Sequence, residues 1–308
     1  MKPTTRRKVR RALTGYSFLS LNIVGFMVFT AIPVVASLVL AFFAYDNITA
    51  PKFVGVGNFT SLLGWHVDQT GRVVMNDPKF WNCLYNTVFM MLGLPLTMVG
   101  SLALALALNR KLPGTITLRT VYYLPTISPM IAVALVWLWI LNPEYGLINY
   151  LISRLGVQGP NWLGDTAWAK PAFILIGTWG GIGGFTMLLY LAALQGIPGV
   201  YYEAAEIDGA SPWKRFRYIT WPLLGPVNFF IIVMGIIGGF QAFGMQYVMT
   251  SGGPAGSTTT IAYYIFNNAF SFFKMGYASA MAWVLFFMIF VLTILQWRFR
   301  RRYTFQYD

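Results

Sequence analysis

The sequence is poor in charged residues, and this lack sets the class of protein. Only 10% of its 308 residues are Asp, Glu, Lys or Arg, whereas a soluble domain carries roughly 25%. Hydrophobic residues make up 57% of the chain. The composition therefore excludes an ordinary soluble domain and indicates a protein that lies mostly within a membrane.

Cysteine and histidine are almost absent, which excludes several kinds of site. Cys83 is the one cysteine, so no disulfide can form within the chain. His66 is the one histidine, and without a cysteine partner it predicts no metal site. No G-x-x-x-x-G-K-[ST] loop is present, so ATP is not expected to bind through a P-loop here. No Ser/His/Asp or paired-carboxylate arrangement can be placed at membrane depth, and we expect neither enzymatic activity nor a cofactor in this chain.

Long apolar runs are the dominant feature of the chain. Each is long enough for a helix that crosses about 30 Å of hydrocarbon, which takes roughly 20 residues. The first is too long for a signal peptide and lacks a small-residue cleavage site. We therefore predict an all-α membrane protein with six transmembrane helices, at about 15–44, 87–109, 120–141, 172–195, 224–250 and 275–297.

The segment 101–108, SLALALAL, alternates with a period of two residues and resembles a strand. Its flanks extend the apolar stretch to the length of a span, and an open strand would leave backbone groups unpaired in lipid. We therefore interpret it as a helix in which small residues permit close contact with a neighbouring helix. These small residues are Ser101, Ala103, Ala105 and Ala107.

The distribution of basic residues predicts the orientation. If the N-terminus is inside, the cytoplasmic segments hold 16 of the 22 Lys and Arg residues and the outside loops hold 6. Cytoplasmic loops are enriched in Lys and Arg, so both termini are predicted to be cytoplasmic. This topology accounts for most of the net charge of +13, and nucleic acid is not expected as a partner. The cytoplasmic segments are then 1–14, 110–119, 196–223 and 298–308, and the outside loops are 45–86, 142–171 and 251–274.

Acidic residues are absent from the predicted spans, because all nine Asp and Glu residues fall in loops or in the C-terminal tail. Proton-driven transporters usually need a titratable group inside the membrane. Sodium coupling is harder to exclude, since backbone carbonyls can serve as ligands. A transporter with this sequence is therefore expected to receive its energy from outside the membrane segment.

The loop 196–223 gathers charge that the rest of the chain lacks. Glu203, Glu206 and Asp208 fall in six positions and are followed closely by three basic residues. The clustered acids argue against a helix lying on the lipid surface, because the cytoplasmic leaflet is negatively charged. The loop is therefore predicted to dock onto another protein.

Two short helices are predicted within this loop. The first carries an apolar stripe at i, i+4 and i+7, and a glycine that readily adopts the left-handed conformation ends it. A serine N-cap with proline at the next position then begins the second helix. The signals in chain order are Pro198 in the first turn; the stripe Val200, Ala204 and Ile207; the stop Asp208-Gly209; the cap Ser211-Pro212; and Trp221-Pro222, which closes the second helix.

Glu203-Ala204-Ala205, followed at set spacings by Gly209, Ile219 and Pro222, resembles the EAA motif of bacterial ABC importer permeases. The family pattern ends in I-x-L-P, and Trp221 here replaces the leucine. The resemblance is strong from about residue 80 to 297. The similarity is to the carbohydrate-import branch of the family. Within that branch the chain resembles the maltose permease subunit, but its first outside loop is much shorter. Three further segments carry the resemblance, at 122–149, 252–258 and 275–283.

This resemblance implies the transmembrane fold of type I ABC importers and a set of partners. In the family the EAA loop is a coupling helix that sits in a cleft of a separate ATPase subunit, which binds ATP and Mg²⁺. Glu203 would meet a basic residue of the ATPase, the two alanines would permit close approach, and Gly209 would permit the turn. A second homologous permease, two ATPase subunits and an extracytoplasmic solute-binding protein complete such a system. The implied coupling residues are Glu203, Ala204, Ala205, Asp208, Gly209, Ile219 and Pro222.

Glycine is concentrated in the fourth and fifth runs, and two interpretations are open. Glycine permits tight helix packing in membranes, or it leaves room for a bulky polar solute. In the maltose relative, the sugar contacts come from the equivalents of these two spans. The positions that match them are Gly181, Ile182, Phe185, Gly235, Gly238, Gly239 and Ala242. Aromatic and amide side chains suited to sugars form an alternative surface at Trp179, Phe185, Phe240 and Gln241.

Together these observations predict a permease subunit of an ATP-driven importer for a sugar or oligosaccharide in the bacterial plasma membrane. Two alternatives are a self-contained facilitator or ion-coupled transporter of a small polar solute, and a membrane scaffold that recruits a cytosolic partner. The predicted organisation is a tail, first helix and outside loop at 1–80, the importer transmembrane domain at 81–297, and a cytoplasmic tail at 298–308.

Overall fold

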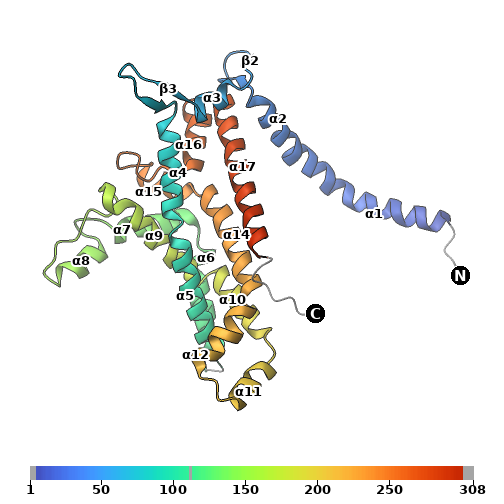
Figure 1. The fold of residues 1–308 in the computed structure, drawn as a ribbon, viewed down its shortest axis with the longest axis vertical. Coiled ribbons are helices and arrows are strands. Elements are labelled where there is room, and N and C mark those ends of the chain that lie inside the picture. The colour runs from blue at the N-terminus through green and yellow to red at the C-terminus, as the bar shows by residue number, and fades with distance from the viewer. Residues whose placement is uncertain (1–4, 111–112, 301–308) are drawn as a thin grey trace. The chain divides into compact units, whose positions relative to one another are not determined.

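The structure is a computed structural model that describes residues 5–110 and 113–300. The predicted C-terminal tail therefore lies mostly outside the described residues, as do the first four residues and part of the loop 110–119. Within the described ranges the chain is helical apart from two sheets of two short strands each (Figure 1). It divides into two compact units, one made of the residues up to Asp77 with Ile265–Val284, the other of Pro78–Tyr264 with the residues from Leu285 onward.

The first unit begins with a long helical segment. Helix α1 (Thr5–Phe26) continues through a π-helical turn, η1 (Met27–Ala31), into α2 (Ile32–Leu40). The π turn precedes a proline at the start of α2, whose ring lacks an N–H and needs a wider turn. Residues 11–40 form a candidate membrane span of 30 residues, which confirms the first predicted run.

The segment that follows, which the sequence predicts to be an outside loop, is well structured. Strand β1 (Phe43–Ala44) pairs with β2 (Lys52–Phe53), helix α3 (Gly57–Leu63) follows, and β3 (Trp65–Val67) pairs with β4 (Val73–Met75). Each hairpin turn contains an aspartate whose carboxylate accepts hydrogen bonds from residues two to four positions ahead. These bonds lower the pKa of Asp46 and of Asp68. The π-helical turn η3 (Asn267–Ser271) and the first part of α17 (Met275–Arg300) complete the unit.

The second unit contains the helices that carry both candidate sites. The long ones are α4 (Pro78–Met90), α5 (Gly93–Leu108), α6 (Thr115–Ile127), α7 (Met130–Ile140), α9 (Thr166–Ile182), α10 (Phe185–Gln195) and α14 (Gly225–Gln241). The short ones are α8 (Leu147–Ser153), α11 (Val200–Ile207), α12 (Pro212–Arg215), the π-helical turn η2 (Phe216–Thr220), α13 (Trp221–Leu223), α15 (Gly244–Thr250) and α16 (Ile261–Phe266), which continues into the first unit.

Three of the six candidate crossings in the structure are bent pairs of helices, and the third pair begins within the loop predicted over 196–223. The described chain has three helices long and apolar enough to cross a membrane, and six such crossings if each bent pair is one span. The bends are 95° between α6 and α7, 41° between α9 and α10, and 61° between the α12–α13 segment and α14. The single helix predicted over 120–141 is wrong, because Ser128, which precedes Pro129, is in an extended conformation and ends α6. The run predicted over 224–250 also breaks, at Ala242 and Phe243, before α15.

The alternating segment 101–108 is helical, as predicted, and forms the end of α5. Only two of its four small residues make close contacts, since Ser101 and Ala105 are buried whereas Ala103 and Ala107 are exposed. Residues four apart share a helix face, and residues two apart lie on opposite sides. The Ser101 hydroxyl donates to the carbonyl of Ile182 at 2.8 Å. The prediction that all four permit close packing is therefore wrong for the two exposed alanines.

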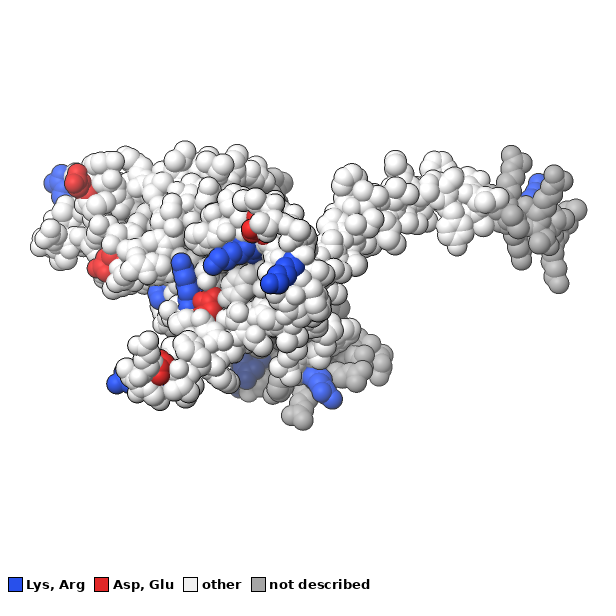
Figure 2. Space-filling model, turned by 90° about the horizontal axis from the view of Figure 1, so that it is seen from above, with Lys and Arg blue, Asp and Glu red and all other residues white. Residues whose placement is uncertain are grey.

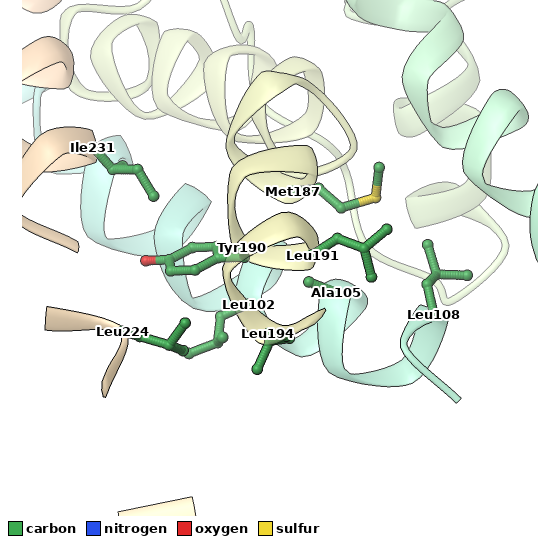
Figure 3. Packing of buried hydrophobic residues seen from close by; sticks show 9 residues of the cluster. All are labelled: Leu102, Ala105, Leu108, Met187, Tyr190, Leu191, Leu194, Leu224 and Ile231. Carbon is green, nitrogen blue, oxygen red and sulfur yellow. The ribbon is translucent and has the colours of Figure 1, made fainter. Parts of the chain in front are cut away.

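The second unit has one buried core where α5, α10 and the start of α14 meet, and another where α7, α9 and α15 meet. Figure 3 shows the first of these cores, in which leucines of α5 and α10 lie near Met187 and Tyr190 of α10. Leu224 and Ile231 also belong to this core. Both α9 and α10 pack against α5. The Tyr190 hydroxyl is buried and donates to the side-chain oxygen of Asn228 at 2.7 Å, which ties α10 to α14.

A second polar contact fixes the loop 251–260 to α4. The buried amide of Asn86 donates to the carbonyls of Gly256 at 3.0 Å and Thr259 at 3.1 Å, and its oxygen accepts from Lys170 at 3.3 Å. The Thr87 hydroxyl accepts from the backbone N–H of Ile261 at 2.9 Å. Two adjacent polar residues on α4 therefore hold this loop, and Asn86 also joins it to Lys170 near the start of α9.

Candidate coupling surface and solute cavity

Helix α11 ends at a left-handed glycine, as the sequence predicts. Gly209 has φ of 70°, a conformation that residues with a Cβ adopt only at a cost. Its N–H donates to the carbonyl of Glu206 at 3.0 Å, and the N–H of Ala210 donates to that of Ala205 at 2.8 Å. This pair of bonds is the Schellman arrangement, which satisfies carbonyls that the helix end leaves free.

The second helix begins at its predicted cap but does not end where predicted. The Ser211 hydroxyl accepts from the backbone N–H of Lys214 at 3.4 Å, and Pro212 is the first helical residue. The prediction that Trp221-Pro222 closes this helix is wrong, because α12, η2 and α13 run on to Leu223. The N–H of Trp221 bonds to the carbonyl of Phe216 five residues earlier, and this widened turn accommodates the proline ring. The first helix also starts later than expected, since Pro198 precedes it by two residues.

Two side-chain contacts bind α11 to the second helix. Glu206 and Arg215 form a salt bridge across the turn. The Tyr202 hydroxyl bonds to that of Thr220 at 2.9 Å, and Thr220 is buried. Because η2 and α13 lead directly toward α14, α11 is connected to the helix that carries the fifth predicted span.

Four exposed side chains lie on one face of α11, namely Val200, Glu203, Ala204 and Ile207, and we call this face the coupling surface. Val200 is 61% exposed and Ile207 88% exposed, although an apolar stripe normally faces the core. Glu203 lies among them and is also exposed. The surface is therefore apolar with one carboxylate, and the fold of this unit leaves it uncovered.

The other predicted coupling residues shape the loop. Ala205 is half-buried, Asp208 is the exposed last residue of the helix, and Gly209 makes the turn. Ile219 and Pro222 are half-buried on the second helix. The structure thus brings the motif together as one helix–turn–helix element.

A cavity of about 320 Å³ opens among α4, α5, α9 and α14. None of the described residues that line it is charged, and most are apolar or glycine. It shares Phe173, Gly177, Ala242 and Gln246 with a second cavity of about 400 Å³, which lies against α6, α7 and α15. We call the first the inner cavity and the second the side cavity; the inner cavity is lined by Thr87, Met90, Met91, Gly93, Leu94, Thr97, Phe173, Ile174, Gly177, Gly235, Gly238, Gly239, Ala242, Gln246 and Thr260.

Some glycines of the fourth and fifth runs permit close helix contact, and others leave open space. A Cβ at Gly183 would lie 2.0 Å from the backbone oxygen of Tyr122, so this glycine permits helix contact. Cβ atoms at Gly177 and Gly238 would meet nothing within 4 Å, and both residues line the inner cavity. These two glycines therefore leave open space.

The predicted path residues fall into three groups. Gly235, Gly238, Gly239 and Ala242 all line the inner cavity. Gly181 and Ile182 instead pack against α5, where a Cβ at Gly181 would lie 2.6 Å from Thr97. The remaining residues line neither cavity: Trp179, Phe185 and Gln241 are exposed, and Phe240 is buried.

Sequence reasoning missed the wall that α4, α5 and α15 supply. Thr87, Leu94 and Gln246 line the inner cavity although they lie far apart in the chain. The available signal was the presence of polar residues inside apolar runs, and it does not show which of them face a cavity.

Charged residues occupy only small parts of the face shown in Figure 2.

Comparison with known proteins identifies the family of this chain. Residues 97–305 match the family described as binding-protein-dependent transport system inner membrane component. The chain belongs to this family. Its members are permease components of transport systems rather than enzymes, and the chain is accordingly a multi-pass membrane permease.

Relatives align over nearly the whole chain. The probable ABC transporter permease protein YesP of Bacillus subtilis (strain 168) is 39% identical over 295 residues, which cover 94% of this chain and 91% of the relative. The lactose transport system permease protein LacF of Rhizobium radiobacter is 36% identical, with coverage of 96% and 97%. The trehalose/maltose transport system permease protein MalF of Thermococcus litoralis is 34% identical, with coverage of 97% and 98%.

The fold agrees with a solved importer. A chain from the crystal structure of a bacterial ABC transporter involved in the import of the acidic polysaccharide alginate superimposes with a TM-score of 0.79. The superposition covers 98% of this chain and 100% of that chain, at 23% sequence identity. The permease therefore has the transmembrane fold of an ABC importer, as the sequence predicts.

Proposed function

We propose that this permease is the membrane subunit of an ATP-driven importer that moves a sugar or oligosaccharide into a bacterial cell. Relatives named for lactose and for trehalose and maltose transport support the solute class. The permease would lie in the plasma membrane with both termini and α11 on the cytoplasmic side, as the bias of basic residues indicates. ATP and Mg²⁺ would bind to partner ATPase subunits.

The observation that carries the energy-coupling part of this proposal is the coupling surface on α11. Val200 and Ile207 expose apolar area on a polar loop, and burial of that area against a protein would be favourable. Glu203 stands free beside them, whereas Glu206 is paired with Arg215. An apolar surface with one carboxylate suits a cleft that holds one basic residue.

The contacts behind α11 make it able to transmit a displacement. The salt bridge between Glu206 and Arg215 and the bond between Tyr202 and Thr220 join it to the second helix. That helix is followed at once by α14, whose glycines line the inner cavity. Movement of an ATPase against α11 would therefore reach the solute cavity through one short segment. A second homologous permease, two ATPase subunits and an extracytoplasmic binding protein are the proposed partners.

The ion-coupled alternative lacks a specific observation in its favour. Every acidic residue in the described part of the chain lies outside the candidate spans, and proton-coupled transport usually requires such a group within the membrane. The scaffold alternative does not explain why the fifth predicted span places glycines around a cavity.

The test combines purification with one charge reversal. The tagged chain is isolated from its native membrane in mild detergent, and its companions are identified by mass spectrometry. We expect a related permease and an ATPase, and a chain isolated reproducibly alone would argue for a self-contained transporter. Glu203→Lys should remove the ATPase and abolish uptake, while the control Glu144→Lys, at an exposed position in a different loop, should retain both. Normal uptake by a well-expressed Glu203→Lys permease would contradict the coupling role.

A further inference from the structure

One buried polar side chain in the inner cavity has no suitable partner. Gln246 is 7% exposed, and its side-chain oxygen accepts no hydrogen bond. Its side-chain nitrogen contacts the sulfur of Met90 at 3.5 Å, and a thioether is only a weak acceptor.

Two of the three threonines that line the same cavity are, in contrast, already paired. The Thr87 hydroxyl donates to the carbonyl of Cys83 at 2.7 Å and accepts from the N–H of Ile261. The Thr260 hydroxyl donates to the carbonyl of Ala242 at 2.7 Å. These hydroxyls stabilise the backbone around the cavity. Since more than about nine in ten buried polar groups are paired in folded proteins, the unpaired amide of Gln246 requires a separate explanation.

Gln246 occupies a position that explains why its amide is unpaired. It lines both the inner and the side cavity, so it stands in the wall that the two share. Its neighbours in this wall are the apolar ring of Phe173 and two residues with little or no side chain, Gly177 and Ala242. A solute that occupied either cavity would meet one amide, which can donate and accept, beside an aromatic ring. Hydroxyl groups on a largely apolar ring face are the chemistry that fits this pair.

We infer that Gln246 is the residue of this permease that hydrogen-bonds the solute within the membrane. In the structure its amide lies against Met90, and a hydroxyl of the sugar would replace that contact as the solute passes. The inference rests on the proposed function for its solute class. It moves the principal polar contact from the positions on α9, α10 and α14 implied by family resemblance to the first turn of α15, four residues beyond Ala242.

The first experiment tests whether position 246 lies on an aqueous path, whatever the solute. Cys83 is the one cysteine of this chain and is buried, so Cys83→Ala removes the only thiol of the permease, and labelling is read on the permease band alone. Gln246→Cys is introduced into this Cys83→Ala variant, and the full transporter in membrane vesicles is treated with the charged thiol reagent methanethiosulfonate-ethyltrimethylammonium. We expect modification that ATP turnover accelerates. Because charged reagents do not enter lipid or a closed core, an unreactive Cys at 246 under all conditions would overturn the inference.

The second experiment uses an isosteric replacement with a matched control. Gln246→Met removes the amide and keeps the volume, and Gln241→Met makes the same change at an exposed position that lines neither cavity. Uptake of lactose, maltose and trehalose is measured with the Tm of the purified permease. We expect uptake through Gln246→Met to fall about tenfold, equal to about 1.4 kcal/mol, with an unchanged or higher Tm because an unpaired buried amide is removed. Gln241→Met should transport normally.

The outcomes separate the inference from the proposed function. Failure of the unmodified transporter to import any sugar would contradict the proposed solute class, and cysteine accessibility would still decide whether 246 lies on the path. Normal uptake by Gln246→Met would overturn the inference and leave the importer assignment intact. A parallel fall in uptake and Tm would also overturn it, since Gln246 would then be a structural residue.

Discussion

The turn at Gly209 allows a test that separates backbone conformation from side-chain size. A Cβ at this position would meet nothing within 4 Å in this chain, so replacement causes no internal clash. The φ of 70° remains, and a left-handed conformation costs an L-residue roughly 1–2 kcal/mol. Asparagine tolerates this conformation better than alanine, and β-branched valine tolerates it least.

The size of this cost matters because little else holds the turn. The exposed salt bridge between Glu206 and Arg215 contributes at most about 1 kcal/mol. The bond between Tyr202 and Thr220 contributes about 1 kcal/mol. A loss of about 1 kcal/mol at Gly209 therefore increases the population of displaced α11 about fivefold, and valine should displace it further.

We expect ATPase retention and uptake to decrease in the order Gly209, Gly209→Asn, Gly209→Ala and Gly209→Val. The assay is co-purification of the ATPase with the tagged permease, with uptake measured in the same cells and expression matched by immunoblot. If contact with the ATPase excluded any side chain here, the small alanine would work better than the larger asparagine. That reversed order, or equal activity of the asparagine and valine variants, would refute the backbone argument.

Three further predictions concern packing. Gly183→Ala should prevent folding or reduce Tm strongly, because the added Cβ would lie 2.0 Å from a backbone oxygen of α6. Gly180→Ala has open space around the added Cβ, so in thermal unfolding it should be neutral or stabilise α9 by up to about 1 kcal/mol. Tyr190→Phe should lower the free energy of unfolding by about 1 kcal/mol, since interhelical hydrogen bonds in membranes contribute roughly 0.6–1.7 kcal/mol. A double-mutant cycle with Asn228→Ala should recover most of this as coupling energy. A coupling energy near zero would refute the assigned bond. Asn86→Ala removes two hydrogen bonds to the loop 251–260, so it should lower the free energy of unfolding by about 2 kcal/mol and accelerate proteolysis of that loop. Unchanged proteolysis would show that other contacts hold the loop.

Features that depend on neighbouring residues in the chain were predictable. The apolar runs predict the spans because a helix in lipid satisfies its own backbone hydrogen bonds. Asp208-Gly209 and Ser211-Pro212 predict a stop and a start because capping involves only residues within one turn. The family resemblance rests on such local motifs, and the comparisons confirm it.

Features that depend on contacts between distant segments were not predictable. The sequence cannot show that Glu206 pairs with Arg215 and leaves Glu203 free, because the turn geometry decides which acid reaches the base. The roles of Gly183 and Gly177 differ for the same reason, since one faces the backbone of α6 and the other a cavity.

The amino-acid sequence by itself determined that this chain is a helical membrane permease with a charged loop that begins and ends two short helices. Hydrophobic length, charge placement and capping act over a few turns, and they are readable without a fold. Tertiary structure alone decided that Gln246, rather than Gln241, faces the cavities. The two glutamines are equally polar in the sequence, and the break after α14 turns α15 so that only one of them is buried against α4.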